Sequence, residues 1–422
     1  MTDLRQIIAR NRAGEAIAIP SVCTAHPDVL EASLTLAETL DQPVVIEATS
    51  NQVNQDGGYT GLTPAAFIAF VGDIATCARV DPARILFGGD HLGPQAWRKL
   101  PADQAMDKAH RMVADYAAAG FTKIHLDCSE GCLGEPAQLP DAITATRSAA
   151  LAATALQHAP DPRTLLFVIG TEVPPPGGAR TDDHGDIPPT TPESAKATLA
   201  AHREAFTALN LPLDQIGGLV VQPGVEFSPM EVHHLPLARD PGLLAALSDW
   251  PTVCLEAHST DYQCPGAYPR LAQLGFAFQK VGPALTFAWR EALYALDTLR
   301  AQNGWASGRS LCDTMEQVML AQPGYWQGHY HGTSADLRTE RHFGLADRIR
   351  YSWPDPQAQA AVARLLADLD GKLLPDPALL AHFAASEIAI ARKSRHPLPR
   401  ALALVRVQTA LRPYFFNAGP RS

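Results

Sequence analysis

The sequence lacks the features that mark membrane, secreted and nucleic-acid-binding proteins. It contains no run of about eighteen or more apolar residues, so no membrane-spanning helix is expected. Polar and charged residues are spread through the first twelve positions, which therefore do not form the apolar stretch of a secretory signal. Acidic residues outnumber lysine and arginine, 44 to 34, and a formal net charge of −10 argues against a basic nucleic-acid surface. These absences favour a cytoplasmic protein with no membrane or nucleic-acid partner.

Glycine-rich nucleotide motifs are also missing. Neither the P-loop pattern nor the dinucleotide-binding pattern occurs, so chemistry that depends on ATP or NAD is disfavoured, including that of a sugar-phosphate kinase. The seven cysteines are scattered and odd in number, which is typical of reduced thiols in a cytoplasm. Cys128 and Cys132 are spaced like a metal-binding pair, but no second pair follows. We interpret them as small residues near the end of a strand.

Short apolar runs alternate with helical patterns through the first two-thirds of the chain, which indicates βαβ units and a parallel sheet. Their hydrophobicity is continuous rather than alternating, as expected of strands that are buried on both faces. Eight such runs favour a closed (β/α)₈ TIM barrel over an open sheet. The expected strands are 16–21, 43–49, 85–89, 123–127, 165–171, 218–222, 253–257 and 278–281.

Helices are expected between these strands and throughout the last third of the chain. Thr63 and Thr191 each precede a proline, a pattern typical of a helix start, and they predict helices over 64–78 and 192–209. A further helix is expected over 102–119, before Gly120. We therefore expect a barrel domain over 1–286 and a helical extension over 287–422, which either packs on the barrel or forms an oligomer interface. The expected helices of the extension are 287–302, 308–320, 356–369, 377–392 and 396–411.

Polar residues are concentrated at the carboxyl ends of the predicted strands, where barrels form their active sites. Buried charges are costly unless they are paired or bind metal, so the cluster predicts an active site. The residues are Glu47, Asn51 and Gln52 after the second strand, Asp90 and His91 after the third, His125 and Asp127 after the fourth, Glu172 after the fifth, Gln222 after the sixth, Glu256, His258, Ser259 and Asp261 after the seventh, and Lys280 at the eighth.

This mixture of histidine and carboxylate predicts a divalent metal, with Zn²⁺ or Mn²⁺ favoured over Ca²⁺. Asn51 and Gln52 belong to an amide-rich loop that either orients sugar hydroxyls or caps its own backbone. Ser259 and Lys280 follow strands seven and eight, where barrels often bind phosphate through loop amides.

Several of these segments resemble the family of the large, so-called non-catalytic subunit of class II tagatose-1,6-bisphosphate aldolase. Two of them are Gly89-Asp90-His91-Leu92-Gly93-Pro94 and Glu256-Ala257-His258-Ser259-Thr260-Asp261. The resemblance extends over 46–55, 168–174, 220–227, 280–286 and 347–351, and so covers nearly the whole chain.

The resemblance implies two possible functions. Some members of the family are stand-alone D-tagatose 6-phosphate 4-epimerases of galactitol or altritol catabolism, and others stabilise and activate a separate catalytic aldolase subunit. The acidic and histidine residues around one barrel mouth favour a working enzyme. The expected partners are a phosphorylated ketohexose and either a second copy of the chain or a catalytic aldolase subunit.

By analogy with class II aldolase barrels, His91, Glu172 and His258 are the expected metal ligands, while Gln222 replaces a histidine ligand of those enzymes. Because C4 of a 2-ketose is β to the carbonyl, its proton is not acidic, and inversion by retro-aldol cleavage and re-addition is favoured. The expected acid and base are Asp90 and either Asp127 or Glu256. The remaining polar residues, Glu47, Asn51, Gln52, His125, Gln222, Ser259, Asp261 and Lys280, are expected to contact substrate. Arg348 and Arg350 either bind phosphate or lie at a surface or interface.

Overall fold

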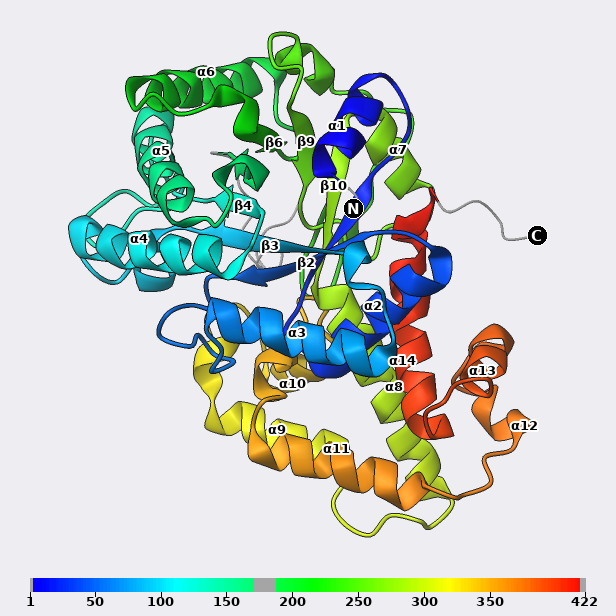
Figure 1. Cartoon of the computed structure of the whole chain (residues 1–422). Helices are drawn as coiled ribbons and strands as arrows, with labels where there is room; N and C mark the ends of the chain where they lie inside the picture. Colours follow the sequence, from blue (N-terminus) through cyan, green and yellow to red (C-terminus); the bar gives the residue numbers. More distant parts are fainter. Residues whose placement is uncertain (1–2, 171–186, 418–422) are drawn as a thin grey trace.

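The computed structural model describes residues 3–170 and 187–417. Within them, eight parallel strands form a closed barrel, which confirms the predicted (β/α)₈ fold (Figure 1). Around the barrel the strands follow one another in the order β1, β2, β3, β4, β5, β6, β9 and β10. Their bounds are β1 Ile19–Cys23, β2 Val44–Thr49, β3 Ile85–Leu92, β4 Lys123–Leu126, β5 Leu166–Ile169, β6 Ile216–Val220, β9 Cys254–Ala257 and β10 Phe276–Val281.

All eight predicted strands are present, with shifts at their ends. The first strand begins at Ile19 rather than at residue 16, and the last begins at Phe276, directly after Gly275 with a φ of 95°. A short antiparallel hairpin, β7 Glu226–Phe227 with β8 Val232–His233, follows the sixth barrel strand.

Helices alternate with the barrel strands and cover their outer faces (Figure 1). Thr63 and Thr191 cap α3 and α6 as predicted, because their hydroxyls accept hydrogen bonds from the backbone amides of Ala66 and Ser194. The bounds are α2 Pro27–Leu40, α3 Pro64–Ala78, α4 Ala102–Ala119, α5 Asp141–His158, α6 Pro192–Ala208, α7 Ala267–Gln273 and α8 Pro283–Gln302. No helix in 3–170 or 187–417 is both long and apolar enough to cross a membrane.

The first helix, α1 Leu4–Arg12, contributes Leu4, Ile7 and Ile8 to a buried cluster with the inward-facing side chains of the barrel. Val45, Val168, Val220 and Phe278 belong to the same cluster, which therefore fills the barrel interior away from its mouth.

The extension consists of α9 Leu311–Ala321, α10 Ser334–Phe343, α11 Pro356–Leu369, α12 Asp376–Leu379, α13 Ala385–Ala391 and α14 Leu398–Leu411. The helix expected over 377–392 is divided in two, because Phe383 turns into the core and Glu387 caps a new start at the Ala384 amide. Helix α10 was not predicted, although Thr333 and Asp336 form its capping box.

Helix α14 lies against α8 and α2, so the end of the extension joins the outer helical layer of the barrel (Figure 1). Arg400 of α14 binds Asp28 at 2.7 Å and Glu31 at 2.7 Å. The expected boundary at residue 286 falls inside the first turn of α8.

Candidate active site

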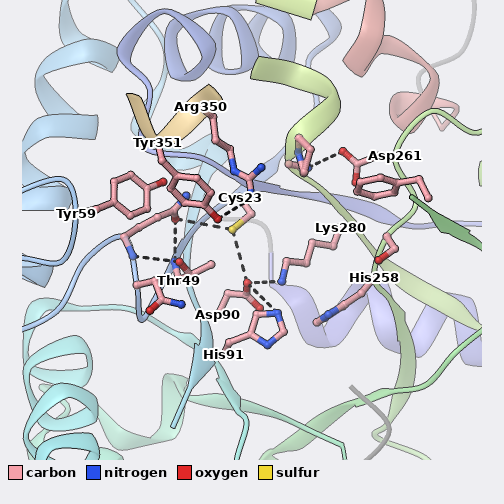
Figure 2. Close-up of a pocket in the computed structure, with 16 residues that line it drawn as sticks. Cys23, Thr49, Tyr59, Asp90, His91, His258, Asp261, Lys280, Arg350 and Tyr351 are labelled. Atoms are coloured by element: carbon pink, nitrogen blue, oxygen red, sulfur yellow. Dashed lines mark hydrogen bonds and ion pairs between the residues drawn. The ribbon is translucent and has the colours of Figure 1, made fainter. Parts of the chain in front are cut away.

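A pocket opens at the carboxyl ends of the strands, and a 3₁₀ turn of the extension, η7 Arg348–Ser352, forms one of its walls (Figure 2). Chain segments more than 300 residues apart therefore share this site. Its lining residues are Cys23, Thr49, Asn51, Gln52, Tyr59, Asp90, His91, Phe227, His258, Ser259, Asp261, Lys280, Gly282, Pro283, Arg350 and Tyr351.

Three buried histidines meet at this mouth. His91 lies in β3, His125 in β4, and His258 directly follows β9. Their ring centroids are 5.0 Å apart for His91 and His125, and 5.2 Å apart for each of the other two pairs. The sequence placed all three at strand ends, but the structure groups His125 with the two histidines that were predicted to bind metal.

Each of these histidines has a carboxylate on one ring nitrogen. For His91 and His258 this contact fixes the proton on the nitrogen that the carboxylate touches and leaves a lone pair on the other nitrogen. This is the usual arrangement of metal-binding histidines. His125 Nδ1 faces both Asp90 and the His91 backbone amide, which donates to it at 3.2 Å. The contacts are His91 Nδ1 to Asp127 Oδ2 at 2.7 Å, His125 Nδ1 to Asp90 Oδ1 at 3.0 Å, and His258 Nε2 to Glu256 Oε1 at 2.9 Å.

Local backbone geometry aims these groups into the mouth. The pairing of β3 with β4 shifts register between Gly89 and Leu92, and His91 has a φ of 48°. Such irregularities re-aim side chains and concentrate at functional sites. The chain then passes so close to β4 that a Cβ on Gly93 would lie 1.7 Å from the Asp127 carbonyl oxygen, so only glycine fits there.

The residues present fit a divalent cation. His125 Nε2 is buried and has no hydrogen-bond partner within the described part of the chain, as expected of a nitrogen that binds metal. Burial lowers the pKa of His91 and lowers that of His258 to about 3, so both rings are neutral near pH 7 and keep their lone pairs. Candidate ligand atoms of Asp90, His91 and His125 lie within 4.8 Å of one another, as do those of His125, Glu256 and His258.

The charge balance of the mouth also favours a cation. With all groups ionised, four buried carboxylates face two lysine ammonium groups and leave two negative charges, although burial raises the pKa of Glu47 and so favours its neutral form. The carboxylates are Glu47, Asp90, Asp127 and Glu256, and the ammonium groups belong to Lys123 and Lys280.

Sequence reasoning missed Lys123. Its fully buried ammonium lies 2.6 Å from Glu47 Oε1 and 2.7 Å from Glu256 Oε2, inside the barrel below the histidines. Burial would lower the pKa of Lys123, but the two carboxylates outweigh burial and raise it, so the group stays charged. The sequence could have indicated this position for Lys123. Side chains two residues apart in a strand point to the same face, and Lys123 precedes His125 by two residues.

Asp90 is tied to Lys280 across the barrel. Lys280 Nζ contacts Asp90 Oδ2, and the same oxygen lies 3.6 Å from Cys23 Sγ (Figure 2). Burial would raise the pKa of Asp90, but the neighbouring histidines and Lys280 hold it well below its usual range. Asp90 is therefore an anion at the pocket wall.

The other predicted substrate contacts divide into two groups. Asn51, Gln52, Ser259, Asp261 and Lys280 line the pocket, whereas Glu47, His125 and Gln222 do not. The side-chain oxygen of Gln222 accepts hydrogen bonds from the amides of Gly224 and Val225 in its own loop, at 2.8 and 3.0 Å.

The amide-rich loop after β2 partly caps its own backbone, because Gln52 Oε1 accepts from the Thr49 amide at 2.9 Å and Asn54 Oδ1 from the Asp56 amide at 2.8 Å. Glu172 lies outside the described residues, so its role stays a prediction. Of the two arginines considered for phosphate, Arg350 lines the pocket, and Arg348 is buried against the Tyr325 carbonyl.

Asp261 caps helix α8 from within the pocket wall. Its Oδ1 accepts hydrogen bonds from the amides of Gly282 at 3.1 Å and Ala284 at 2.8 Å, at the start of that helix. Burial nevertheless raises the pKa of Asp261 from 3.8 to about 6. The folded chain therefore holds this proton more tightly than the unfolded chain does.

Because the pKa of Asp261 is raised in the folded chain, the stability of the fold should depend on pH. The protonated Asp261 carboxyl contributes fully to stability below about pH 4. This contribution is lost as the pH rises through 6, because ionising a buried carboxyl is unfavourable. Asp261→Asn keeps the acceptor oxygen and removes the titration. From pH 4 to pH 7 the variant should gain about 2 kcal/mol of unfolding free energy relative to the wild type. Denaturant unfolding at each pH measures this, and a difference that does not change with pH would contradict it.

Nearly the whole chain is similar to a described protein family, to a named relative and to a solved structure. Residues 4–418 match the family described as D-tagatose-1,6-bisphosphate aldolase subunit GatZ/KbaZ-like. A protein of Agrobacterium fabrum (strain C58) named D-tagatose 6-phosphate 4-epimerase is 47% identical over 388 residues, 89% of each chain. A crystal structure described as a probable tagatose 6 phosphate kinase from Sinorhizobium meliloti 1021 is 46% identical, with a TM-score of 0.86, and the match covers 94% of this chain and 99% of that one.

Proposed function

This chain belongs to the D-tagatose-1,6-bisphosphate aldolase subunit GatZ/KbaZ-like family, and from that premise we propose that it is a 4-epimerase. Its reaction would interconvert D-tagatose 6-phosphate and D-fructose 6-phosphate. The observation that carries the proposal is the cluster of three buried histidines, each fixed by a carboxylate, at the mouth of a barrel. A subunit that only supports another protein has no need of such a centre, because burying these charges is costly. The name of the 47% identical relative agrees with this reaction.

The chemistry follows from the position of C4. Its C–H bond is not activated by the C2 carbonyl, so the stereocentre is inverted by breaking the C3–C4 bond. A base removes the proton of the C4 hydroxyl, C4 becomes an aldehyde carbon, and the bonding pair passes to the C2–C3 enediolate. The aldehyde then turns its other face, C3 attacks C4 again, and the new C4 oxygen takes a proton. Atoms and electrons balance without an oxidant or a reductant.

His91, His125 and His258 would hold the divalent ion, with Zn²⁺ or Mn²⁺ as the choice that suits nitrogen ligands. When bound, such an ion supplies Lewis-acid polarisation of the ketose oxygens. Asp127 and Glu256 are the alternatives from the sequence for the second acid or base, and because they contact His91 and His258 and do not line the pocket, we assign them to orienting these two histidines.

Asp90 is the base that we assign to the C4 hydroxyl. It lines the pocket as an anion, and Lys280 beside it limits the cost of its buried charge. Asn51 and Ser259 line the same pocket and are placed to contact the hydroxyls and phosphate of the sugar.

The test is direct. The purified chain is incubated with D-tagatose 6-phosphate and Zn²⁺ or Mn²⁺, and fructose 6-phosphate is followed with a coupled dehydrogenase, with and without a chelator. Metal-dependent product is expected, and Asp90→Asn should reduce kcat by about 10²–10⁴-fold.

Two other outcomes identify other functions. Absence of product with every metal would favour the role of a subunit for a separate aldolase, the function in the description of the family. ATP consumption that depends on tagatose 6-phosphate would favour the kinase description of the 46% identical structure. An added ATP arm with a phosphate readout therefore completes the assay.

A further inference from the structure

Inversion at C4 needs proton transfer on two sides, because the C4 oxygen lies on opposite faces of the carbon chain in the two epimers. Asp90 serves one side. Asp127 and Glu256 hold histidines, as Asp90 itself holds His125, and Asp261 caps a helix. Neither Asp127 nor Glu256 lines the pocket.

We propose that Tyr351, in the 3₁₀ turn η7 of the C-terminal extension, is the second acid and base of this reaction. The inference rests on the proposed epimerase function. Figure 2 shows Tyr351 and Arg350 across the pocket from Asp90 and His91, with Cys23 between the two groups.

The groups around Tyr351 favour the phenolate form of its side chain. Arg350 Nη2 donates a hydrogen bond to its hydroxyl oxygen at 2.8 Å. The guanidinium carbons of Arg350 and Arg348 lie 4.4 and 5.1 Å from the centroid of its ring. The ring is fixed by stacking on Tyr325, at 5.2 Å between centroids and 12° between planes, and by the edge of Tyr59 at 5.0 Å.

This geometry leaves the phenolic proton for a ligand. The oxygen accepts from Arg350, and no acceptor for its own proton is found among the side chains that the structure describes. Burial would raise the pKa of Tyr351, but Arg350 and Arg348 outweigh burial and lower it. Cys23 also faces it from β1 and opposes the arginines, whereas Tyr59 faces it as a phenol whose pKa burial raises. Tyr351 is therefore the more acidic of the two pocket phenols.

The proton balance is simple. In one direction Asp90 takes the proton of the C4 hydroxyl, and after the aldehyde has turned, Tyr351 gives its proton to the new C4 oxygen. In the reverse direction the Tyr351 phenolate takes that proton and Asp90 returns one. The two groups recover their starting states by exchange with water between turnovers.

The test compares Tyr351→Phe with the wild type under conditions where the wild type forms fructose 6-phosphate. The variant should lose about 10²–10⁴-fold in kcat, keep KM within a few-fold, and keep the same bound metal. A second variant carries 3-fluorotyrosine at 351, which acidifies the phenol and keeps its shape. The limb of the kcat–pH profile that belongs to Tyr351 should move to lower pH.

Tyr325→Phe is the matched control, because it also removes one phenol hydroxyl from the stack and leaves the Tyr351 hydroxyl in place. It should keep wild-type kcat. Full kcat in Tyr351→Phe, or a pH profile that fluorotyrosine does not move, would overturn the assignment while epimerisation by the wild type stands. A wild type that forms no product would instead overturn the epimerase function and the assignment together.

Discussion

Replacing Lys123 with methionine is expected to destabilise the fold by about 3–5 kcal/mol, the cost of removing one partner from a buried ion pair. The change leaves Glu47 and Glu256 facing each other in the barrel interior without a cation between them. Their charge is relieved by protonation, so the loss should shrink as the pH falls. Denaturant unfolding at several pH values measures both effects. Activity should fall as well, because Glu256 fixes the ring of His258.

Lys108→Met is the matched control for this change. Lys108 pairs with Asp56 at 3.0 Å on the surface, with 40% of its side chain exposed, so the same substitution should cost less than about 1 kcal/mol. The double variant Lys123→Met/Glu47→Gln should recover part of the lost stability. Equal losses in the two lysine variants would mean that the buried network does not support the fold.

Replacing His125 with asparagine is expected to lower metal affinity by more than about 100-fold and to abolish turnover. Changes to groups that only orient metal ligands cost about 10–100-fold in affinity, and the loss of a ligand should exceed that. The prediction rests on His125 Nε2, which is buried and lacks a protein partner in the described segments while Asp90 holds Nδ1. Equilibrium dialysis with Zn²⁺ or Mn²⁺, followed by metal analysis, gives the affinity without any activity assay.

His202→Asn controls for the loss of a buried imidazole. His202 of α6 is equally buried, its Nδ1 bonds the Thr198 carbonyl at 2.8 Å, and its Nε2 also has no hydrogen-bond partner in the described chain. Its neighbours include no cluster of metal-ligating groups within the described residues. This variant should bind metal normally, and metal binding by His125→Asn at wild-type affinity would remove His125 from the centre.

The barrel and its mouth were predictable because both depend on local signals. Continuous apolar runs indicate buried parallel strands, and the geometry of a barrel brings the residues after those strands to one end. Asp90, His91 and His258 lie at that end of the barrel, where the strand pattern put them. What the pattern could not supply was their pairing, such as His125 with Asp90, which depends on the register shift between β3 and β4.

Two pocket or barrel residues, Lys123 and Tyr351, were not singled out from the sequence, each for a different reason. Lys123 lies inside a strand rather than after it, so a search of strand ends passes over it. Tyr351 lies about seventy residues beyond the last barrel strand, in a turn that only tertiary packing brings to the pocket. The helix expected over 377–392 was wrong for a related reason, because the burial of Phe383 overrides local helix propensity.

The division of the pocket between the barrel and η7 has a consequence for synthesis on the ribosome. Chains fold from the N-terminus as they emerge. The eight strands are complete once residue 281 is available, when β10 can pair with β1 and all three histidines are in place. Arg350 and Tyr351 emerge about seventy residues later. The end of the barrel that carries the three histidines can thus form before η7, which closes the opposite wall of the pocket, has been synthesised.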